Sequence, residues 1–348
     1  MKIGLGLDAT LNLSWRDQET LSREAATLGY DSLWTPESNG QDSFSTCTAW
    51  WRGSRKVIDP GLITGIAVSP VMYRSPMAFA KSAGELAEMS GGRFILGIGS
   101  GSAYRADARR AFGLKPVPVL TLMREYVESI RALLSGDAVD YEGMAITLKS
   151  ARLGMRPPRT PIYLGALGPN MLQLGGELAD GVCLNWCNSA QVQINRQRIA
   201  EGATRAGRNP ADIEVVEYIR VAVDDNHDRA RDALARVVLG YALGNTMPSE
   251  RDRRFGYRAH FECMGFADEL MELDVMRAQG AKLDHLVKKT PDALLSAVGC
   301  YGNAQEVVAQ FKVLAAGLDR AIVRVVATQS DLDGVRVGML ACRPELVA

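Results

Sequence analysis

The chain has 348 residues, of which 47% are hydrophobic and 23% are charged. Forty Lys and Arg residues balance forty Asp and Glu residues, so the formal net charge at pH 7 is zero. This balance argues against a dedicated binder of nucleic acid or of a membrane surface, which would carry a basic excess. The apolar content argues against a disordered chain, because it can offset the entropy lost on folding.

The sequence contains no pattern typical of export or of a metal site. The N-terminal apolar stretch is short and is followed by Asp8, which is atypical of a signal peptide. No apolar run reaches the roughly 18 residues of a membrane-spanning helix. Six cysteines without a C-x-x-C pair and three scattered histidines predict reduced thiols and no metal ligands. We therefore expect a cytoplasmic protein without a metal.

Strand-like and helix-like segments alternate along the chain. The predicted strands are residues 2–7, 31–34, 61–68, 93–98, 161–164, 181–184, 213–223 and 321–326. The predicted helices are residues 19–28, 76–89, 118–134, 170–178, 190–206, 228–243 and 303–316. Strands separated by helices pair in parallel, because parallel neighbours need crossover connections. Eight such strands favour an α/β fold of the (β/α)8 TIM-barrel type, built as one elaborated domain over residues 1–348.

Two segments do not belong to a minimal barrel. Residues 136–148 have the pattern of a small β-hairpin. Residues 244–299 form a long, charged and partly helical insertion between the seventh and eighth strands. An insertion of this length near the mouth of a barrel is typical of a lid or of a subunit contact.

The first glycine pattern is Gly4-x-Gly6-x-x-Ala9, which matches the dinucleotide-binding fingerprint only in its letters. That fingerprint requires a complete strand before its first glycine, and only three residues precede Gly4. We therefore interpret these glycines as packing positions inside the first strand.

Two later glycine patterns follow predicted strands, where barrel enzymes bind their ligands. Residues 97–102 (GIGSGS) directly follow an apolar strand, and Arg105, Arg109, Arg110 and Lys115 come soon afterwards. Such a loop can hold an anion with its backbone N–H groups, although a tight turn beside a solvated helix face gives the same pattern. Residues 165–170 (GALGPN) place Pro169 at the first position of a helix, whose N-terminus also favours anions.

Few other polar groups follow the predicted strands. Glu37 comes after the second strand and could donate or accept a proton, although a loop glutamate in a surface ion pair fits equally well. Asn185 and Trp186 follow the sixth strand and could supply an amide and an aromatic wall. The chain contains no nucleophile elbow and no P-loop. A bound cofactor that carries the chemistry is the natural inference.

Four segments together resemble the bacterial-luciferase-like oxidoreductases that use flavin or deazaflavin. They are GYDSLWTPES, SGGRFILGIGSG, REYVESIRALLSG and PIYLGALGPNMLQLGGELADGVCLNW, and the resemblance extends over roughly residues 1–223 and 301–326. The sequence is most similar to the coenzyme F420-dependent branch, typified by methylenetetrahydromethanopterin reductase. For the insertion at 244–299 we find no matching motif of that family.

The resemblance implies a luciferase-like barrel with the cofactor across its carboxyl-terminal mouth. A bulge with a non-proline cis peptide, expected at Gly65-Ile66, would support the ring, and the two glycine loops would hold the phosphate. The predicted cofactor-binding residues are Gly65, Ile66, Gly99, Ser100, Gly101, Ser102, Gly165, Ala166, Gly168, Pro169, Asn170 and Asn185. Two differences argue against a sugar-phosphate dehydrogenase. Ser38 stands where many deazaflavin enzymes have a histidine, and Ser102 stands where the sugar-phosphate dehydrogenases of the family have a glutamate.

The sequence thus predicts an F420-dependent oxidoreductase that transfers a hydride between C5 of the cofactor and a small organic substrate, with Glu37 handling the proton. The alternatives are an FMN-dependent monooxygenase of the same superfamily and a catalytically silent barrel that stores a flavin derivative. The resemblance and the zero net charge also favour a homodimer. Neither nucleic acid nor a membrane is expected as a partner.

Overall fold

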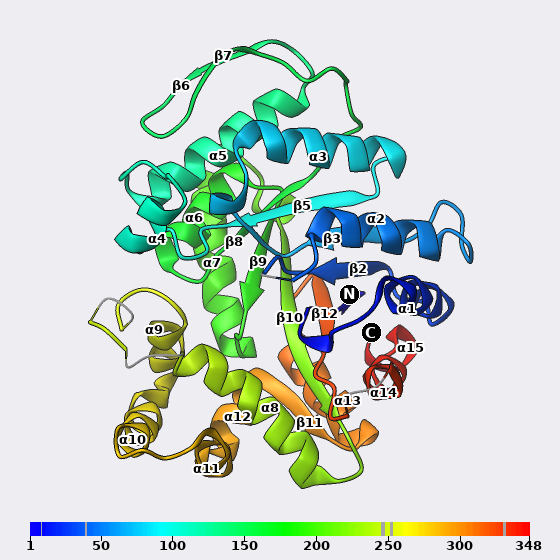
Figure 1. Cartoon of the computed structure of the whole chain (residues 1–348), viewed down its shortest axis with the longest axis vertical. Coiled ribbons are helices and arrows are strands. Elements are labelled where there is room, and N and C mark those ends of the chain that lie inside the picture. The colour runs from blue at the N-terminus through cyan, green and yellow to red at the C-terminus, as the bar shows by residue number, and fades with distance from the viewer. Residues whose placement is uncertain (8, 39, 245–247, 251–252, 330–331) are drawn as a thin grey trace.

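The computed structural model describes residues 1–7, 9–38, 40–244, 248–250, 253–329 and 332–348, and its central element is a closed parallel barrel (Figure 1). The barrel strands are β1 (Lys2–Gly6), β2 (Ser32–Thr35), β3 (Ile63–Ile66), β5 (Phe94–Gly99), β8 (Ile162–Gly165), β9 (Gly181–Asn185), β10 (Glu214–Val223) and β12 (Arg320–Val325). Each strand pairs in parallel with the next, and β12 closes the ring between β10 and β1. The predicted (β/α)8 barrel is confirmed, and every predicted strand overlaps an observed one.

Helices cover the outside of the barrel (Figure 1). The longer ones are α1 (Trp15–Thr27), α2 (Ser43–Ser54), α3 (Pro76–Met89), α5 (Val119–Leu134), α6 (Pro169–Leu178), α7 (Ser189–Arg205), α8 (His227–Ala242), α13 (Ala304–Leu314) and α14 (Leu332–Ala341). Short helices are α4 (Ala106–Ala111) and α15 (Pro344–Val347), with 3-10 turns η1 (Ala9–Leu11), η2 (Val71–Tyr73) and η3 (Pro210–Asp212). None of the described helices is both long enough and apolar enough to cross a membrane.

The barrel interior is filled by aromatic side chains that face glycines. Trp34, Tyr163 and Tyr218 belong to one buried cluster inside the ring. A Cβ atom on Gly4 would lie 2.8 Å from the Trp34 ring, and one on Gly6 would lie 2.8 Å from the Tyr218 ring. The glycines of the first strand therefore make room for these rings, as their interpretation as packing positions predicts.

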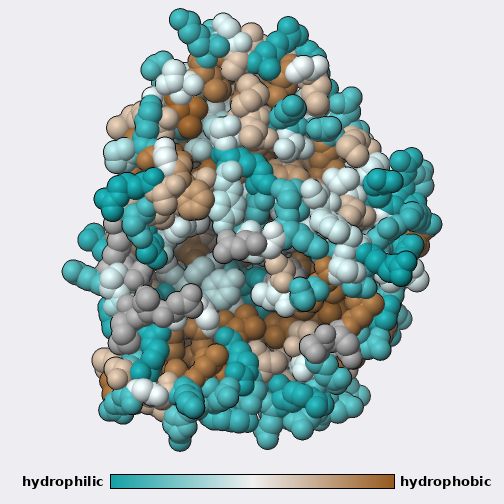
Figure 2. Space-filling model, in the orientation of Figure 1, coloured by the Kyte–Doolittle hydropathy of each residue, from teal (hydrophilic) through white to brown (hydrophobic). Residues whose placement is uncertain are grey.

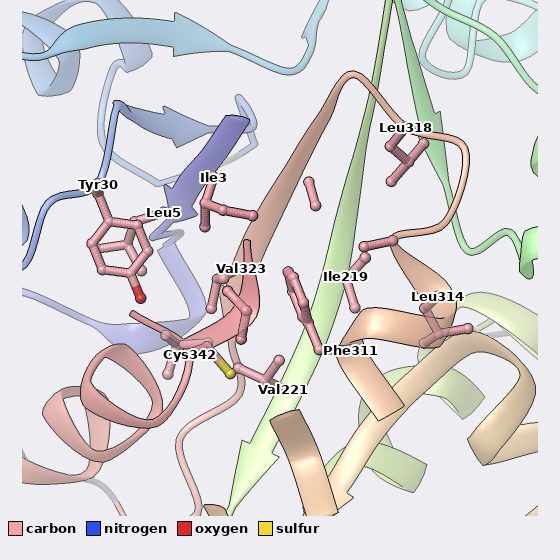
Figure 3. Close-up of a cluster of buried hydrophobic side chains, with 14 of the residues drawn as sticks. Ile3, Leu5, Tyr30, Ile219, Val221, Phe311, Leu314, Leu318, Val323 and Cys342 are labelled. Atoms are coloured by element: carbon pink, nitrogen blue, oxygen red, sulfur yellow. The ribbon is translucent and has the colours of Figure 1, made fainter. Parts of the chain in front are cut away.

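A larger core lies between the strands and the outer helices. Figure 3 shows Ile219 of β10 and Val323 of β12 beside Phe311 of α13, with Leu5 of β1 next to Tyr30 in the same cluster. These side chains are almost completely buried. Apolar burial of this kind, worth about 25 cal/mol per Å², fixes the helices against the barrel and holds the strand ends at the mouth in place.

The two additions to the barrel lie at opposite ends of the molecule in Figure 1. The predicted hairpin is confirmed as β6 (Val139–Glu142) paired antiparallel with β7 (Thr147–Ala151). The insertion contains α9 (Tyr257–Phe261), the π turn η4 (Glu262–Phe266), α10 (Ala267–Ala278), α11 (Leu283–Lys289) and α12 (Asp292–Val298). It ends in β11 (Gly299–Gly302), which adds to β10 outside the ring and which the sequence did not predict.

Helix α2 is a further element that the sequence did not predict. Its segment, SFSTCTAWWRGS, is rich in Ser, Thr and Trp, which are poor helix formers. Asp42 caps the helix by accepting the Ser45 N–H at 2.8 Å, and Trp50 is completely buried against its neighbours. Tertiary burial therefore outweighs the weak local preference.

Candidate active site at the barrel mouth

A bulge after β3 forms one wall of the mouth. The Ala67–Val68 peptide bond is cis although it does not precede proline, and β4 (Ser69–Pro70) then pairs with the end of β5. The cis bond expected at Gly65–Ile66 is therefore placed wrongly, by two residues. Gly65 packs against the Trp34 ring and Ile66 is fully buried in the outer core, so neither residue reaches the mouth surface.

Val68 connects the bulge to both predicted glycine loops. A Cβ atom on Gly99 would lie 2.5 Å from its Cγ2, and one on Gly165 would lie 3.1 Å from the same atom. Gly99 ends β5 and Gly165 ends β8, and these strands are paired. The structure thus brings the two loops together beneath one side chain, and their glycines make room for the bulge.

The loop after β5 continues as a compact turn. Ser100 O accepts the Ala103 N–H at 2.9 Å, and the Ser102 hydroxyl lies 3.6 Å from the Met72 sulfur. Gly101, with φ of +51°, packs against Pro70 of β4. The predicted residues 99–102 therefore line one continuous edge beside the bulge.

The basic residues that follow this loop do not gather at the mouth. Arg105 pairs with Asp107 at 2.7 Å, and Lys115 reaches the Met144 carbonyl on the hairpin at 3.4 Å. Arg109 donates to the Ala103 carbonyl and so supports the loop itself. These contacts do not support the hypothesis that the basic residues after the loop form a positive patch for a ligand.

The N-terminus of α6 is open. Gly168 is its N-cap, no side chain caps the helix, and Pro169 occupies the first position as the sequence predicts. Gly168, Pro169 and Asn170 are exposed, and a Cβ atom on Gly168 would meet no atom within 4 Å. An uncapped start attracts anions through its N–H groups and the helix dipole. Ala166, by contrast, is buried and donates its N–H to the Cys183 carbonyl.

Asn185 stands at the carboxyl end of β9, opposite Tyr218 of β10 in the strand register. Arg220 donates from Nη1 to Asn185 Oδ1, and Asn185 Nδ2 donates to the Tyr257 hydroxyl at 2.7 Å. The Arg220 guanidinium lies 3.7 Å from the centre of the Trp186 ring, which is fully buried. Asn185 is thus held in one orientation above the interior of the barrel.

Glu37 is also held by protein groups. Arg74 binds both of its carboxylate oxygens, with Nη2 to Oε1 at 2.7 Å, and the Ser69 hydroxyl donates to Oε2. Burial alone would lower the pKa of Arg74, but its bonds to Glu37 and Asp42 raise it overall. The Glu37 side chain is only 5% exposed, and its backbone N–H donates to the Val68 carbonyl at 3.2 Å. These contacts tie the end of β2 to the bulge.

A cavity of about 680 Å³ opens between the carboxyl end of β12 and helix α8. Its walls combine apolar groups such as Leu11 and Val237 with charged groups of both signs, among them Asp228, Asp232 and Arg324. Figure 2 shows this face of the molecule hollowed across its middle, with hydrophobic surface beside the hollow. The volume is within the usual range for a small-molecule pocket.

Arg74, Arg220 and Tyr257 belong to the site but were not predicted from the sequence. Arg220 lies three residues after Glu217 in the strand β10, and two charges of opposite sign inside a mostly apolar strand are the signal that could have found it. Tyr257 lies in the insertion, where no motif marks it. Within the described ranges no group of His, Cys, Asp or Glu is arranged to hold a metal ion, and all six cysteines are free.

The geometry defines a TIM-barrel protein whose mouth has an anion-attracting helix start, a braced bulge and a cavity. The profile of the luciferase-like monooxygenase family matches residues 2–320, so the chain belongs to this family. It is 32% identical over 250 residues to the 5,10-methylenetetrahydromethanopterin reductase of Archaeoglobus fulgidus, covering 71% of this chain and 72% of the relative.

Solved structures show the same fold over the whole chain. The coenzyme F420-dependent tetrahydromethanopterin reductase of Methanopyrus kandleri superposes with a TM-score of 0.77 at 22% identity, covering 99% of both chains. An F420-dependent secondary alcohol dehydrogenase in complex with an F420-acetone adduct gives a TM-score of 0.73 at 19% identity, covering 100% of this chain and 99% of the other. The predicted resemblance to luciferase-like oxidoreductases is confirmed.

Proposed function

We propose that the chain is a coenzyme F420-dependent oxidoreductase that transfers a hydride between C5 of the deazaflavin and a small organic substrate. The observation that carries the proposal is a packing contact beside the uncapped N-terminus of α6. There the Val68 side chain lies against both Gly99 and Gly165. Relatives whose names include coenzyme F420, an oxidoreductase and a glucose-6-phosphate dehydrogenase among them, support the choice of cofactor.

The residues present fit a ring with a phosphate-bearing tail. The uncapped N-terminus of α6 offers N–H groups and the positive end of the helix dipole to a phosphate, and no side chain obstructs Gly168. Ser100 and Ser102 would add hydroxyl donors from the neighbouring loop. The bulge at Ala67–Val68 would support one face of the ring, which replaces the role first predicted for Gly65 and Ile66.

When bound, the cofactor supplies the hydride chemistry. The protein orients the partners and excludes part of the water, and orientation of this kind contributes much of an enzymatic rate. The cavity between β12 and α8 is the proposed place for the substrate. Its mixture of apolar walls and charged groups of both signs suits a small organic molecule that carries polar groups.

Glu37 remains our proposed proton-handling residue. Its three hydrogen bonds from Arg74 and Ser69 suggest a second role, which is to hold the bulge. The two roles differ in their consequences for Glu37→Gln. A proton-handling role predicts slower turnover with unchanged F420 affinity, whereas a holding role predicts that F420 affinity falls as well.

We also propose that the insertion acts as a lid. A Cβ atom on Gly256 would lie 3.7 Å from the Tyr104 hydroxyl, so the insertion and the loop after β5 meet across the mouth. Both segments flank the proposed cofactor site. The homodimer and the cytoplasmic location stay predictions.

A fluorescence titration tests the proposed cofactor. We expect quenching of oxidised F420 at micromolar protein and little quenching of FMN under the same conditions. Retention of FMN with no binding of F420 would instead favour an FMN-dependent monooxygenase. The family to which the chain belongs takes its name from monooxygenases of this kind. F420 binding without any acceptor-dependent oxidation of the reduced cofactor, across carbonyl, imine and enone acceptors, would favour the storage protein.

A further inference from the structure

The orientation of the Asn185 amide determines which way the Tyr257 hydroxyl can donate. A guanidinium is only a donor, so the atom of Asn185 that contacts Arg220 must be the carbonyl oxygen. The other end of the amide is then the NH2 group, which can only donate. It contacts the Tyr257 oxygen at 2.7 Å, so Tyr257 accepts this hydrogen bond and keeps its own hydrogen for another partner.

Arg220 is itself fixed, which makes this orientation robust. Its guanidinium stacks 3.7 Å above the Trp186 ring and donates to the Tyr218 carbonyl at 3.2 Å. Arg220 is completely buried. If the Asn185 amide flipped, its NH2 group would face the N–H donors of the Arg220 guanidinium, so the observed orientation is fixed.

Tyr257 is held above the barrel interior. Asn185 lies level with Tyr218 in the strand register, and Tyr218 points into the barrel. The Tyr257 ring packs edge-on against Tyr241 at 4.7 Å, and Tyr241 lines the cavity. Gly256 precedes Tyr257 with φ of +120° and ψ of −168°, a conformation open essentially to glycine alone, and so sets the entry of this helix.

The Tyr257 hydroxyl hydrogen has no acceptor among the residues that the structure describes. Its only hydrogen bond there is the one that it accepts from Asn185. Burial and the neighbouring Tyr241 raise the pKa of Tyr257, so the hydroxyl keeps its hydrogen at neutral pH. It stands between the cavity and the end of β9, the strand next to β8 and its open helix start.

We propose that the Tyr257 hydroxyl donates a hydrogen bond to an acceptor atom of the cofactor ring, a carbonyl oxygen or a ring nitrogen. The inference rests on the proposed function, because it needs a heteroaromatic ring at the mouth. It makes the insertion part of the binding site, since its first helix carries the donor and Asn185 and Arg220 aim it.

The test is a fluorescence titration of oxidised F420 against the full chain and its Tyr257→Phe variant. We expect binding roughly three- to tenfold weaker in the variant, the effect of losing one buried donor to a ligand. Tyr30→Phe is the matched control, because Tyr30 donates to the Met339 carbonyl at 2.8 Å in the outer core. That variant should lose thermal stability and keep its affinity for F420.

The variant Asn185→Asp keeps Tyr257 but should redirect its hydroxyl hydrogen away from the ligand. A carboxylate at this position would accept from both Arg220 and the Tyr257 hydroxyl, so the hydroxyl hydrogen would turn away from the ligand. We expect weaker F420 binding in this variant as well. Because the new charge could itself weaken binding, the double variant with Tyr257→Phe is decisive. It should bind F420 within about twofold of Asn185→Asp alone, since the donor is already withdrawn.

The outcomes separate the two proposals. If the unaltered chain does not bind F420, the proposed function fails. If the unaltered chain binds F420 and Tyr257→Phe binds it equally tightly, with both proteins folded by circular dichroism, the role of Tyr257 is overturned. A further severalfold loss on adding Tyr257→Phe to Asn185→Asp would also overturn it, because the phenol would then act by packing alone.

Discussion

Single side chains at the mouth show why the glycines of this chain stand where they do. Gly99 and Gly165 belong to loops whose sequences predict anion binding, yet each glycine packs against Val68 of the bulge. Gly97 likewise faces the Ile66 carbonyl oxygen. The primary physical reason for these glycines is the space that the bulge needs, and a ligand-binding edge is the consequence.

Gly99→Ala should therefore destabilise the fold. Its new Cβ would lie 2.5 Å from Val68, and overpacking of this kind costs about 1–3 kcal/mol in the free energy of unfolding. Gly168→Ala is the control, because its Cβ meets no atom within 4 Å and its φ is −81°. Urea unfolding of both variants checks this, and equal stability of the two would contradict it.

At the scale of elements, one carboxylate fastens the hairpin to the barrel. Glu125 of α5 is buried, and its two oxygens accept the backbone N–H groups of residues 144–146 at 2.8–2.9 Å. These residues form the turn between β6 and β7. Val139, Tyr141 and Leu148 pack the two strands against the outer core, so we infer that the Glu125 contact fixes the turn between them.

Glu125→Gln should loosen the hairpin. The amide NH2 replaces one acceptor and faces N–H donors, which costs about 1–3 kcal/mol. Limited proteolysis should then cleave near residues 143–146 several times faster than in the unaltered chain. Glu142→Ala, on the exposed side of β6, should leave the rate unchanged. A hairpin that resists protease equally in all three proteins would show that other contacts hold it.

The whole molecule has a buried acid that links its stability to pH. Glu217 of β10 accepts the Cys187 N–H at 2.6 Å through Oε1, whereas Oε2 has no hydrogen-bond partner among the described residues. Burial raises its pKa from 4.5 to about 8, although the Cys187 N–H and Arg220 oppose the rise. Burial of His260 nearby lowers the pKa of that imidazole.

Stability from this group should therefore fall as the pH rises from 4.5 to about 8. Between pH 4.5 and about 8 the folded chain keeps the Glu217 proton that the unfolded chain releases. The free energy of unfolding then decreases with rising pH, by up to about 1.4 kcal/mol per unit from this group. Glu217→Gln removes this term, so its stability relative to the unaltered chain should rise from pH 5 to pH 8. Parallel pH dependence in urea unfolding of the two proteins would refute the assignment.

His260 contributes in the opposite direction. Its folded pKa lies below the ordinary value of 6.5, so the unfolded chain takes up a proton first as pH falls through that value. Stability from this group is present above pH 6.5 and is lost at lower pH. The two buried groups together narrow the pH range in which the barrel is most stable.

The sequence by itself determined the barrel and its family. Local periodicity predicts eight strands separated by helices, and each strand depends mainly on its own apolar residues and on the turn glycines beside it. The two glycine loops and the helix start at Pro169 could be found for the same reason, since the local chain specifies them. Membership of the luciferase-like family followed from the order of these segments.

Only the tertiary structure decided how the mouth is assembled. The pairing of Glu37 with Arg74 and the contact of Asn185 with Tyr257 join residues that are 37 and 72 positions apart, and the cis peptide lies two residues from its expected place. Helix α2 likewise forms because its Trp50 is buried by other elements. Contacts between segments distant in the chain depend on the closed ring, which brings the carboxyl ends of all eight strands to one face.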